Sequence, residues 1–354
     1  MTDSLLQVIE RTATLWQDPD YERRRDATEK FLDSDAPFSE ESVVFAVNQL
    51  MSQLTAEAIE LWIGGRIVTQ PRRVTAVLKA RTPVSGFREL LAALVTGHSF
   101  RCAMQEGEPV LLAAFVGEMR QTIDLPVEFI SEDLVPEGTD LLIADVSDDL
   151  RTDLVQRFEE LGDREGRLLL LPETFSVAVL DGKEREEDLE YLAEDVLLYN
   201  GTDFRSVALI WAPDGVSPDP LLDAFAQFRG IVPVHPRIPG SLKMQVAFLK
   251  ARNIPHAFGE GMEFLLSKGA PDVQPPGHVR WTVYNDLKEV EDWLVEQGSR
   301  IETVVARRAM LERLRSTVPV QEPGFAHRPE LEWYPGGVDL IGFLAGESTD
   351  RLTG

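Results

Sequence analysis

The segment that decides the fold comprises residues 192–215, LAEDVLLYNGTDFRSVALIWAPDG. A charged helix-forming stretch ends near Tyr199, Asn200 and Gly201 break it, and a short polar turn follows. Residues 207–212 are then continuously apolar, which predicts a buried strand. Helix, tight turn and strand in this order predict an α/β layer. Such a turn is where α/β enzymes present a nucleophile, but this one offers no nucleophile of the usual kind.

Strand and helix patterns alternate on both sides of this segment. Upstream, the pattern predicts strands at 74–78, 99–104, 127–130, 141–146 and 168–171, and helices at 87–95, 109–119 and 149–161. Downstream, it predicts strands at 176–180, 207–212, 278–284 and 301–306, and helices at 186–199, 221–228, 241–251, 287–297 and 307–314. This alternation is typical of parallel sheets covered by helices on both faces. The first 65 residues instead carry helical patterns at 5–16, 21–32, 43–54 and 55–62, which predict an N-terminal helical layer.

The composition limits the classes of partner. The chain has 354 residues, 35 of them basic and 60 acidic, for a formal charge of −25. This excess argues against nucleic acid or an anionic membrane surface as a partner. The acidic residues are spread among apolar positions, so they indicate an acidic surface and no disordered tail. That surface is either an ordinary solvated one or an adaptation to a salt-rich (halophilic) cytoplasm.

A single cysteine, Cys102, excludes an internal disulfide and any multi-cysteine metal site. Its place in a predicted strand is typical of a buried small apolar residue. The five histidines lack metal-binding spacing and are expected in turns or at the surface, so no metal is expected. The chain also lacks a signal peptide pattern and a run long enough for a membrane helix. We therefore expect a soluble cytoplasmic protein.

The turn also carries a family resemblance. The pattern Tyr-x-Gly, Arg-x-Val and a closing Pro within residues 199–213 resembles the active-site segment of LuxC-type acyl-CoA reductases, in the aldehyde dehydrogenase superfamily. Residues 83–87, 176–182 and 323–340 are also similar to segments of that family, so the likeness covers almost the whole chain. The resemblance implies an aldehyde dehydrogenase-like α/β fold, with two doubly wound parallel-sheet domains and an N-terminal helical layer.

The same resemblance implies a domain plan and a reaction. The expected parts are an N-terminal helical layer at 1–65, a Rossmann-like cofactor-type domain at 66–183, a catalytic-type α/β domain at 184–325 and a C-terminal segment at 326–354. The family reaction is NADPH-dependent reduction of a fatty acyl-CoA to an aldehyde through a thioester on a cysteine.

The resemblance places the family's catalytic positions on unusual residues. The catalytic cysteine falls on Phe204, whose ring cannot form a covalent intermediate. The neighbouring Thr202 or Asp203 could replace it only weakly without an adjacent base. Arg81 stands where the family holds the oxyanion with Asn; it is either a longer donor or a solvent-facing turn arginine. Glu173 falls near the general-base Glu, unless it is an ordinary loop glutamate.

The cofactor-binding positions are altered as well. Ala103 falls where the family has a Lys that pairs with the cofactor ribose or its phosphate. Arg101, on the same strand face, is either a substitute ligand for the NADP phosphate or a structural strand residue. In the loop that should seat the cofactor, Ser147 follows Asp145, which has the wrong charge, and Val146, which replaces a Gly. NADP is thus the cofactor that the resemblance implies, against the charge and size of these residues.

Three hypotheses follow for function. The first is a degenerate, non-catalytic acyl-CoA reductase-like protein (a pseudoenzyme) that acts as a binding or partner subunit. Its partners would be an acyl-CoA or fatty acyl ligand, an active paralogue, or a second copy of the chain. The alternative is an active NADPH-dependent acyl-CoA reductase, or another oxidoreductase, with a non-standard nucleophile. The third is a new activity that uses Asp203, Glu173 and Arg81. Phe204 is expected to occlude the acyl site.

Overall fold

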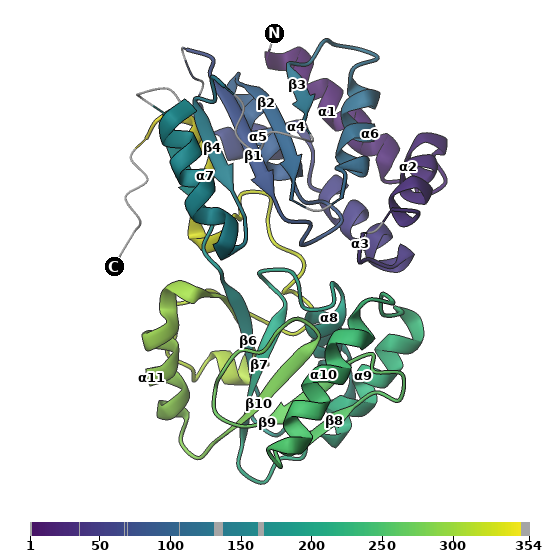
Figure 1. Ribbon diagram of the computed structural model, residues 1–354, viewed down its shortest axis with the longest axis vertical. Helices are drawn as coiled ribbons and strands as arrows, with labels where there is room; N and C mark the ends of the chain where they lie inside the picture. Colours follow the sequence, from purple (N-terminus) through teal and green to yellow (C-terminus); the bar gives the residue numbers. More distant parts are fainter. Residues whose placement is uncertain are drawn as a thin grey trace. The chain divides into compact units, whose positions relative to one another are not determined.

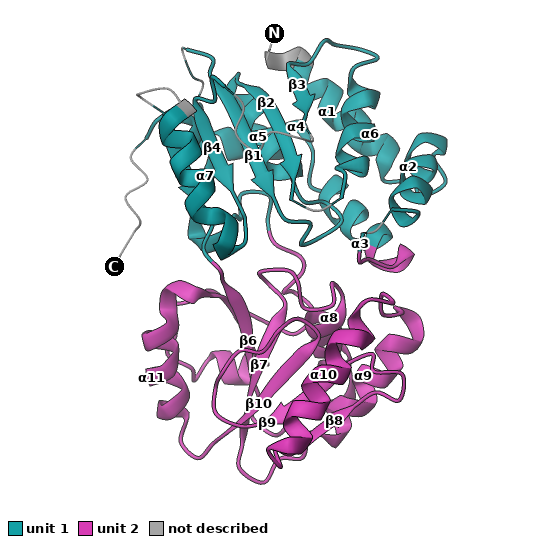
Figure 2. Cartoon of the chain, viewed as in Figure 1, with its two compact units in different colours: residues 1–36, 43–172, 330–354 teal, residues 37–42, 173–329 magenta. Residues whose placement is uncertain are grey.

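The computed structural model describes residues 2–34, 36–66, 68, 70–105, 107–130, 137–161 and 166–347. The chain forms two compact units, which Figure 2 shows in different colours. Unit 1 comprises residues 1–36, 43–172 and 330–354, and unit 2 comprises residues 37–42 and 173–329. Each unit is built on its own β-sheet (Figure 1).

The predicted N-terminal helices are present: α1 (Thr2–Trp16), α2 (Glu22–Leu32), α3 (Glu40–Met51) and α4 (Ala56–Ile63). Helix α4 begins where the Thr55 side chain accepts a hydrogen bond from the Ala58 N–H, and it ends at Gly64, which has a positive φ of 59°. Helices α1 and α2 both pack against α6 (Val110–Met119). The Trp16 ring meets Phe115 of α6 edge-on at 5.3 Å. The helical layer therefore shares a core with the rest of unit 1.

The unit 1 sheet has the order β3-β2-β1-β4-β5, and every neighbouring pair is parallel. Its strands are β1 (Arg73–Leu78), β2 (Ser99–Met104), β3 (Val127–Phe129), β4 (Leu141–Ala144) and β5 (Arg167–Leu170). Two more helices of this unit follow β1 and β4: α5 (Phe87–Thr96) and α7 (Asp148–Leu161). Val77 and Ala103 pack with Leu154 of α7 on one face of the sheet. Because side chains alternate along a strand, Cys102 points to the opposite face.

The unit 2 sheet has the order β12-β11-β6-β7-β10-β9-β8. Its strands are β6 (Phe175–Val179), β7 (Val207–Pro213), β8 (His256–Phe258), β9 (Leu265–Lys268), β10 (His278–Tyr284), β11 (Ile301–Val305) and β12 (Val320–Gln321). Its helices are α8 (Glu186–Leu197), α9 (Asp219–Ile231), α10 (Ile238–Ala251), α11 (Leu287–Gln297) and α12 (Arg308–Leu311), with a 3₁₀ turn at Gly298–Arg300. Helices α8 and α9 cover one face, and α11 and α12 the other. The prediction of two doubly wound sheets is confirmed.

Some elements differ from the predicted pattern. The short strands β8, β9 and β12 and the helix α13 (Leu340–Ala345) were not predicted, and α12 is shorter than the predicted helix at 307–314. Strand β8 also runs antiparallel to β9, in an otherwise parallel sheet. Helix α13 follows a 3₁₀ turn at Pro335–Gly337 and packs against α5. Compact units need not be domains that fold independently, so the domain boundaries stay a prediction.

Candidate functional site

The carboxyl edge of the unit 1 sheet is the first candidate site, because the strand order reverses there. The chain runs from β1 outward to β2 and β3, then returns to β4 on the other side of β1. Open α/β sheets bind ligands outside the carboxyl ends of the strands at such a point. Arg81 follows β1 and Asp145 follows β4, so the topology brings both residues to it.

Arg81 and Asp145 form a bidentate ion pair at this edge. The Arg81 Nε lies 2.6 Å from one carboxylate oxygen of Asp145, and its Nη2 lies 2.8 Å from the other. The two side chains are only 18% and 6% exposed. The Arg81 backbone N–H also donates to the Ser85 hydroxyl at 3.1 Å, which fixes the turn. The alternative of a solvent-facing turn arginine is therefore wrong.

A second buried acid lies on α5 in the same unit. The Tyr334 hydroxyl donates to a carboxylate oxygen of Glu89 at 2.8 Å, and both side chains are buried. Burial raises the pKa of Glu89, while the hydrogen bond from Tyr334 acts in the opposite direction. The charge of Asp145 also raises this pKa. The interior beneath the carboxyl edge thus carries acidic groups where a phosphate would need positive charge.

The other predicted cofactor residues are engaged within unit 1. Arg101 pairs with Glu128 of the neighbouring strand at 3.0 Å. Ala103 is buried against the α7 side of the sheet. The Ser147 hydroxyl accepts a hydrogen bond from the Gln105 amide at 2.8 Å. These contacts join strands and loops of the sheet.

The turn of residues 200–206 lies at the amino edge of the unit 2 sheet, just before β7. Asn200 and Gly201 both have positive φ, 55° and 77°, which ends the helical stretch as the sequence predicted. Phe204 is only 6% exposed, and its carbonyl accepts a hydrogen bond from the Ser176 hydroxyl at 3.4 Å. The Thr202 hydroxyl donates to the Tyr199 carbonyl at 2.7 Å. The Ser176 contact joins the turn to β6, and the Thr202 contact closes the turn that follows α8.

Asp203 faces His327, a histidine that was expected in a turn or at the surface. His327 is buried, with its Nδ1 3.0 Å from an Asp203 carboxylate oxygen and its Nε2 3.1 Å from the Asp195 carbonyl. The Asp195 carbonyl can only accept a hydrogen bond, so the His327 Nε2 donates to it. The ring also meets Tyr199 edge-on at 4.8 Å. His327 and His98 lie in connecting segments, as predicted, although both are buried. The expectation of a turn or surface position is wrong for His278, which is buried at the start of β10.

Asp195 of α8 holds the segment around His327 in place. Its carboxylate accepts backbone N–H groups of Gly324 at 2.7 Å and Ala326 at 3.0 Å. The buried Arg205 guanidinium donates to the Ala326 carbonyl. Burial raises the pKa of Asp195 to about 7, against the charge of His327 and the two N–H donors. The segment at 323–328, part of the family resemblance, is thus tied to α8 and to the turn.

The remaining predicted catalytic residue, Glu173, is exposed on the segment before β6. Next to it, the Thr174 hydroxyl donates to the buried carboxylate of Glu302 at 2.5 Å. Sequence reasoning missed Glu302. Its one signal was an acidic residue inside the apolar strand at 301–306. The structure therefore brings Asp203 to His327 and Arg81 to Asp145.

Comparison with known proteins gives the fold a name. No protein-family model and no curated protein matches the sequence. Among solved structures, an oxidoreductase from Marinobacter aquaeolei has a TM-score of 0.72 at 13% identity, covering 96% of this chain and 82% of that one. A NAD-dependent benzaldehyde dehydrogenase from Corynebacterium glutamicum has a TM-score of 0.67 at 13% identity, covering 93% and 83%. The fold is aldehyde dehydrogenase-like.

An indole-3-acetaldehyde dehydrogenase in complex with NAD+ shares this aldehyde dehydrogenase-like fold, with a TM-score of 0.67 at 12% identity over 92% of this chain and 77% of that one. The carboxyl edge of unit 1 does not fit such a dinucleotide. A phosphate needs positive charge and open backbone N–H groups at a helix N-terminus. Here α7 begins with Asp148 and Asp149, and Asp145 and Val146 precede it.

The described part of the chain was searched for membrane-spanning helices and for metal-binding clusters, and neither is found there. None of the described helices combines the length and the apolar character needed to cross a bilayer. Among the described residues, no three His, Cys, Asp or Glu side chains gather into a group that could hold a metal ion.

The lone thiol of Cys102 should be inert in the folded protein. Cys102 is 0% exposed, and burial, with a smaller effect of the Glu89 charge, raises its pKa to about 12. A reactive cysteine needs the thiolate and access. We expect no reaction with a chromogenic disulfide reagent at neutral pH, and one thiol per chain after unfolding in denaturant. Stoichiometric reaction of the folded protein within minutes would contradict this.

Proposed function

We propose that this chain is an acyl-CoA reductase-like protein that has lost reductase chemistry and acts as a binding or partner subunit. The observation that carries the proposal is the buried Arg81–Asp145 pair at the point where the unit 1 strand order reverses. The resemblance places Arg81 at the oxyanion position and Asp145 in the loop that would hold the cofactor phosphate. Because the two side chains pair with each other, their charges cancel and neither is open to a ligand.

Two further observations support the same proposal. The nucleophile position is a buried phenylalanine, Phe204. Its acidic neighbour Asp203 is hydrogen-bonded to His327, whose second ring nitrogen contacts a backbone carbonyl. Both side chains are thus held by contacts within unit 2. The proposal also includes occlusion of the acyl site by Phe204, a fatty acyl or acyl-CoA ligand and NADP as the ancestral cofactor. It further includes a cytoplasmic location and a partner that is another protein or a second copy of this chain.

The test is the absorbance of NADPH in the presence of purified protein and a long-chain acyl-CoA. We expect no loss of absorbance at low or molar salt, and no change in NADPH fluorescence on addition of protein. Urea unfolding curves at both salt concentrations provide the control for a folded sample. NADPH-dependent turnover would overturn the proposal, and its loss in Cys102→Ser would assign it to the lone thiol. Light scattering of the purified protein then tests self-association as the partner arrangement.

A further inference from the structure

A cavity lies at the carboxyl edge of the unit 2 sheet, where the strand order of this unit reverses. From β6 the chain proceeds to β7 and β10 on one side, and β11 and β12 lie on the other side of β6. The pairs of β11 with β6 and with β12 are parallel, so the carboxyl ends of all three strands meet at this edge. Helices α8 and α11 lie on opposite faces of the sheet. This arrangement produces a ligand crevice in open α/β sheets.

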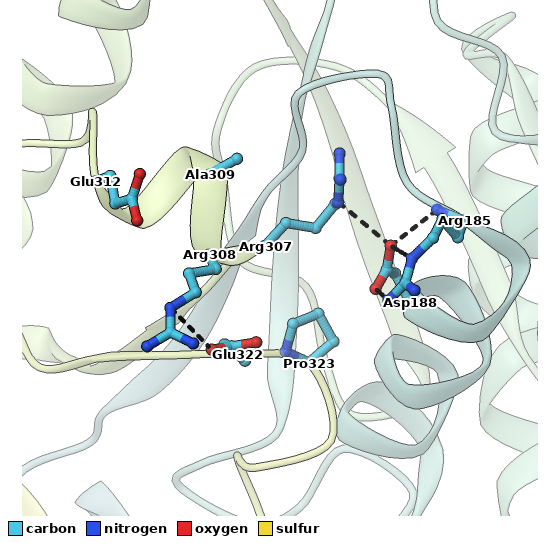
Figure 3. A pocket seen from close by; sticks show the side chains of 8 residues that line it. All are labelled: Arg185, Asp188, Arg307, Arg308, Ala309, Glu312, Glu322 and Pro323. Carbon is cyan, nitrogen blue, oxygen red and sulfur yellow. Dashed lines mark hydrogen bonds and ion pairs between the residues drawn. The ribbon is translucent and has the colours of Figure 1, made fainter.

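The cavity has a volume of about 330 Å³, at the lower end of the range for small-molecule sites. Figure 3 shows that its lining comes from the segments after all three strands. The charged residues of the lining are Arg185, Asp188, Arg307, Arg308, Glu312 and Glu322. Three cations and three anions leave the lining without net charge at neutral pH.

The inner charges of the cavity are held in a fixed network. Arg307 lies 3.0 Å from an oxygen of Asp181 through its Nη1 and 3.2 Å from an oxygen of Asp188 through its Nε. Arg185 lies 2.9 Å from the second oxygen of Asp188. The hydrogen bond from Arg185 holds the pKa of Asp188 below its usual range, so this carboxylate stays ionised. Arg307, Asp181 and Asp188 are largely buried, whereas the Arg185 side chain is 68% exposed. The network joins the segments that follow β6 and β11.

The outer charges are not satisfied by each other. Arg308 and Glu322 are 4.0 Å apart, which is too long for a hydrogen bond. Both side chains are largely exposed. Glu312, one helical turn after Arg308, also lines the cavity and is exposed. The guanidinium of Arg308 and the carboxylates of Glu312 and Glu322 therefore line the cavity with hydrogen-bond donors and acceptors that are open to a ligand.

We propose that this cavity binds a small zwitterion, a free α-amino acid, with its carboxylate on Arg308 and its ammonium group between Glu312 and Glu322. An ion of one sign gains little from a lining without net charge. A dipolar molecule replaces the long Arg308–Glu322 pair by charge-assisted hydrogen bonds at both ends. The cavity lies roughly 20 Å from the turn of residues 200–206, since β6 and β7 separate the two edges. Binding here is independent of the proposed loss of reductase chemistry.

The test is isothermal titration calorimetry on the full chain with L-alanine and L-glutamine at millimolar concentrations. Sodium acetate and methylammonium chloride, which carry one charged group each, are the matched controls. We expect saturable binding of at least one amino acid and none of either single ion. Absence of binding by both amino acids, or equal binding of acetate, would overturn the proposal.

Three variants locate the binding. Arg308→Gln and Glu322→Gln each remove one outer charge from an exposed side chain and should weaken binding by about tenfold or more. Arg315→Gln changes an exposed arginine outside the lining and should leave affinity unchanged. Urea unfolding of each variant confirms that the fold is kept. Affinity retained in both Arg308→Gln and Glu322→Gln would place the bound amino acid elsewhere and refute the site.

Discussion

Replacing Arg81 by methionine is expected to lower the free energy of unfolding by about 3–5 kcal/mol, because it leaves the Asp145 carboxylate buried without its partner. Both Arg81–Asp145 contacts are of hydrogen-bond length, and the Asp145 side chain is only 6% exposed. The Glu89 carboxyl of the same unit cannot compensate, since a carboxyl group never carries a positive charge and burial raises its pKa. Urea unfolding curves of the variant and the parent measure the loss.

A matched control separates burial from distance. Lys288 and Asp292 of α11 form an ion pair with the same 2.6 Å separation as Arg81 and Asp145, but both side chains are about two-thirds exposed. Lys288→Met should therefore leave the unfolding curve nearly unchanged, because water already screens that pair. If Arg81→Met and Lys288→Met had the same effect, the burial argument would be wrong.

The double variant Arg81→Met, Asp145→Leu tests whether the pair is needed for stability at all. Apolar residues of similar size in place of a buried ion pair are often neutral or stabilising. We expect the double variant to regain most of the stability lost in Arg81→Met. That result would mean that the pair is kept for a reason other than stability, such as ancestry or specificity of the fold. It would agree with the proposal that the pair fills a former nucleotide site.

The sheets were predictable from the sequence because their signal is local. A short apolar run such as residues 74–78 or 207–212 identifies a buried strand by itself, and β1 and β7 match those predictions closely. Strands β8, β9 and β12 have two to four residues, too few for a periodicity to be seen. The antiparallel direction of β8 relative to β9 depends on pairing between the strands, which a local sequence pattern does not show.

The pairings of the candidate site were beyond local patterns. Arg81 and Asp145 are 64 positions apart, and only the adjacency of β1 and β4 brings their charges together. Asp203 and His327 are separated by 124 positions. Position-by-position comparison gave each of these residues a separate role. It did not reveal that they satisfy one another.

The stability of unit 2 should fall as pH rises from about 4 to about 7, because of Asp195. Burial raises the pKa of this carboxyl from 3.8 to about 7, so the folded state binds a proton that the unfolded state has released. Its contribution is complete below the unfolded pKa and is lost as pH rises through the folded pKa. Over about three pH units, the loss is about 4 kcal/mol relative to a side chain that does not titrate.

Asp195→Asn provides that reference, because an amide keeps one oxygen for the Gly324 or Ala326 N–H. The measurement is urea unfolding of both proteins at several pH values between about 4 and 8, with the difference in free energy plotted against pH. Asp188→Asn, also on α8, is the matched control: the pKa of Asp188 is lowered, so its contribution is lost only in more acidic solution. Parallel curves for the parent and Asp195→Asn would mean that Asp195 is ionised throughout, and that its two N–H donors and His327 outweigh its burial.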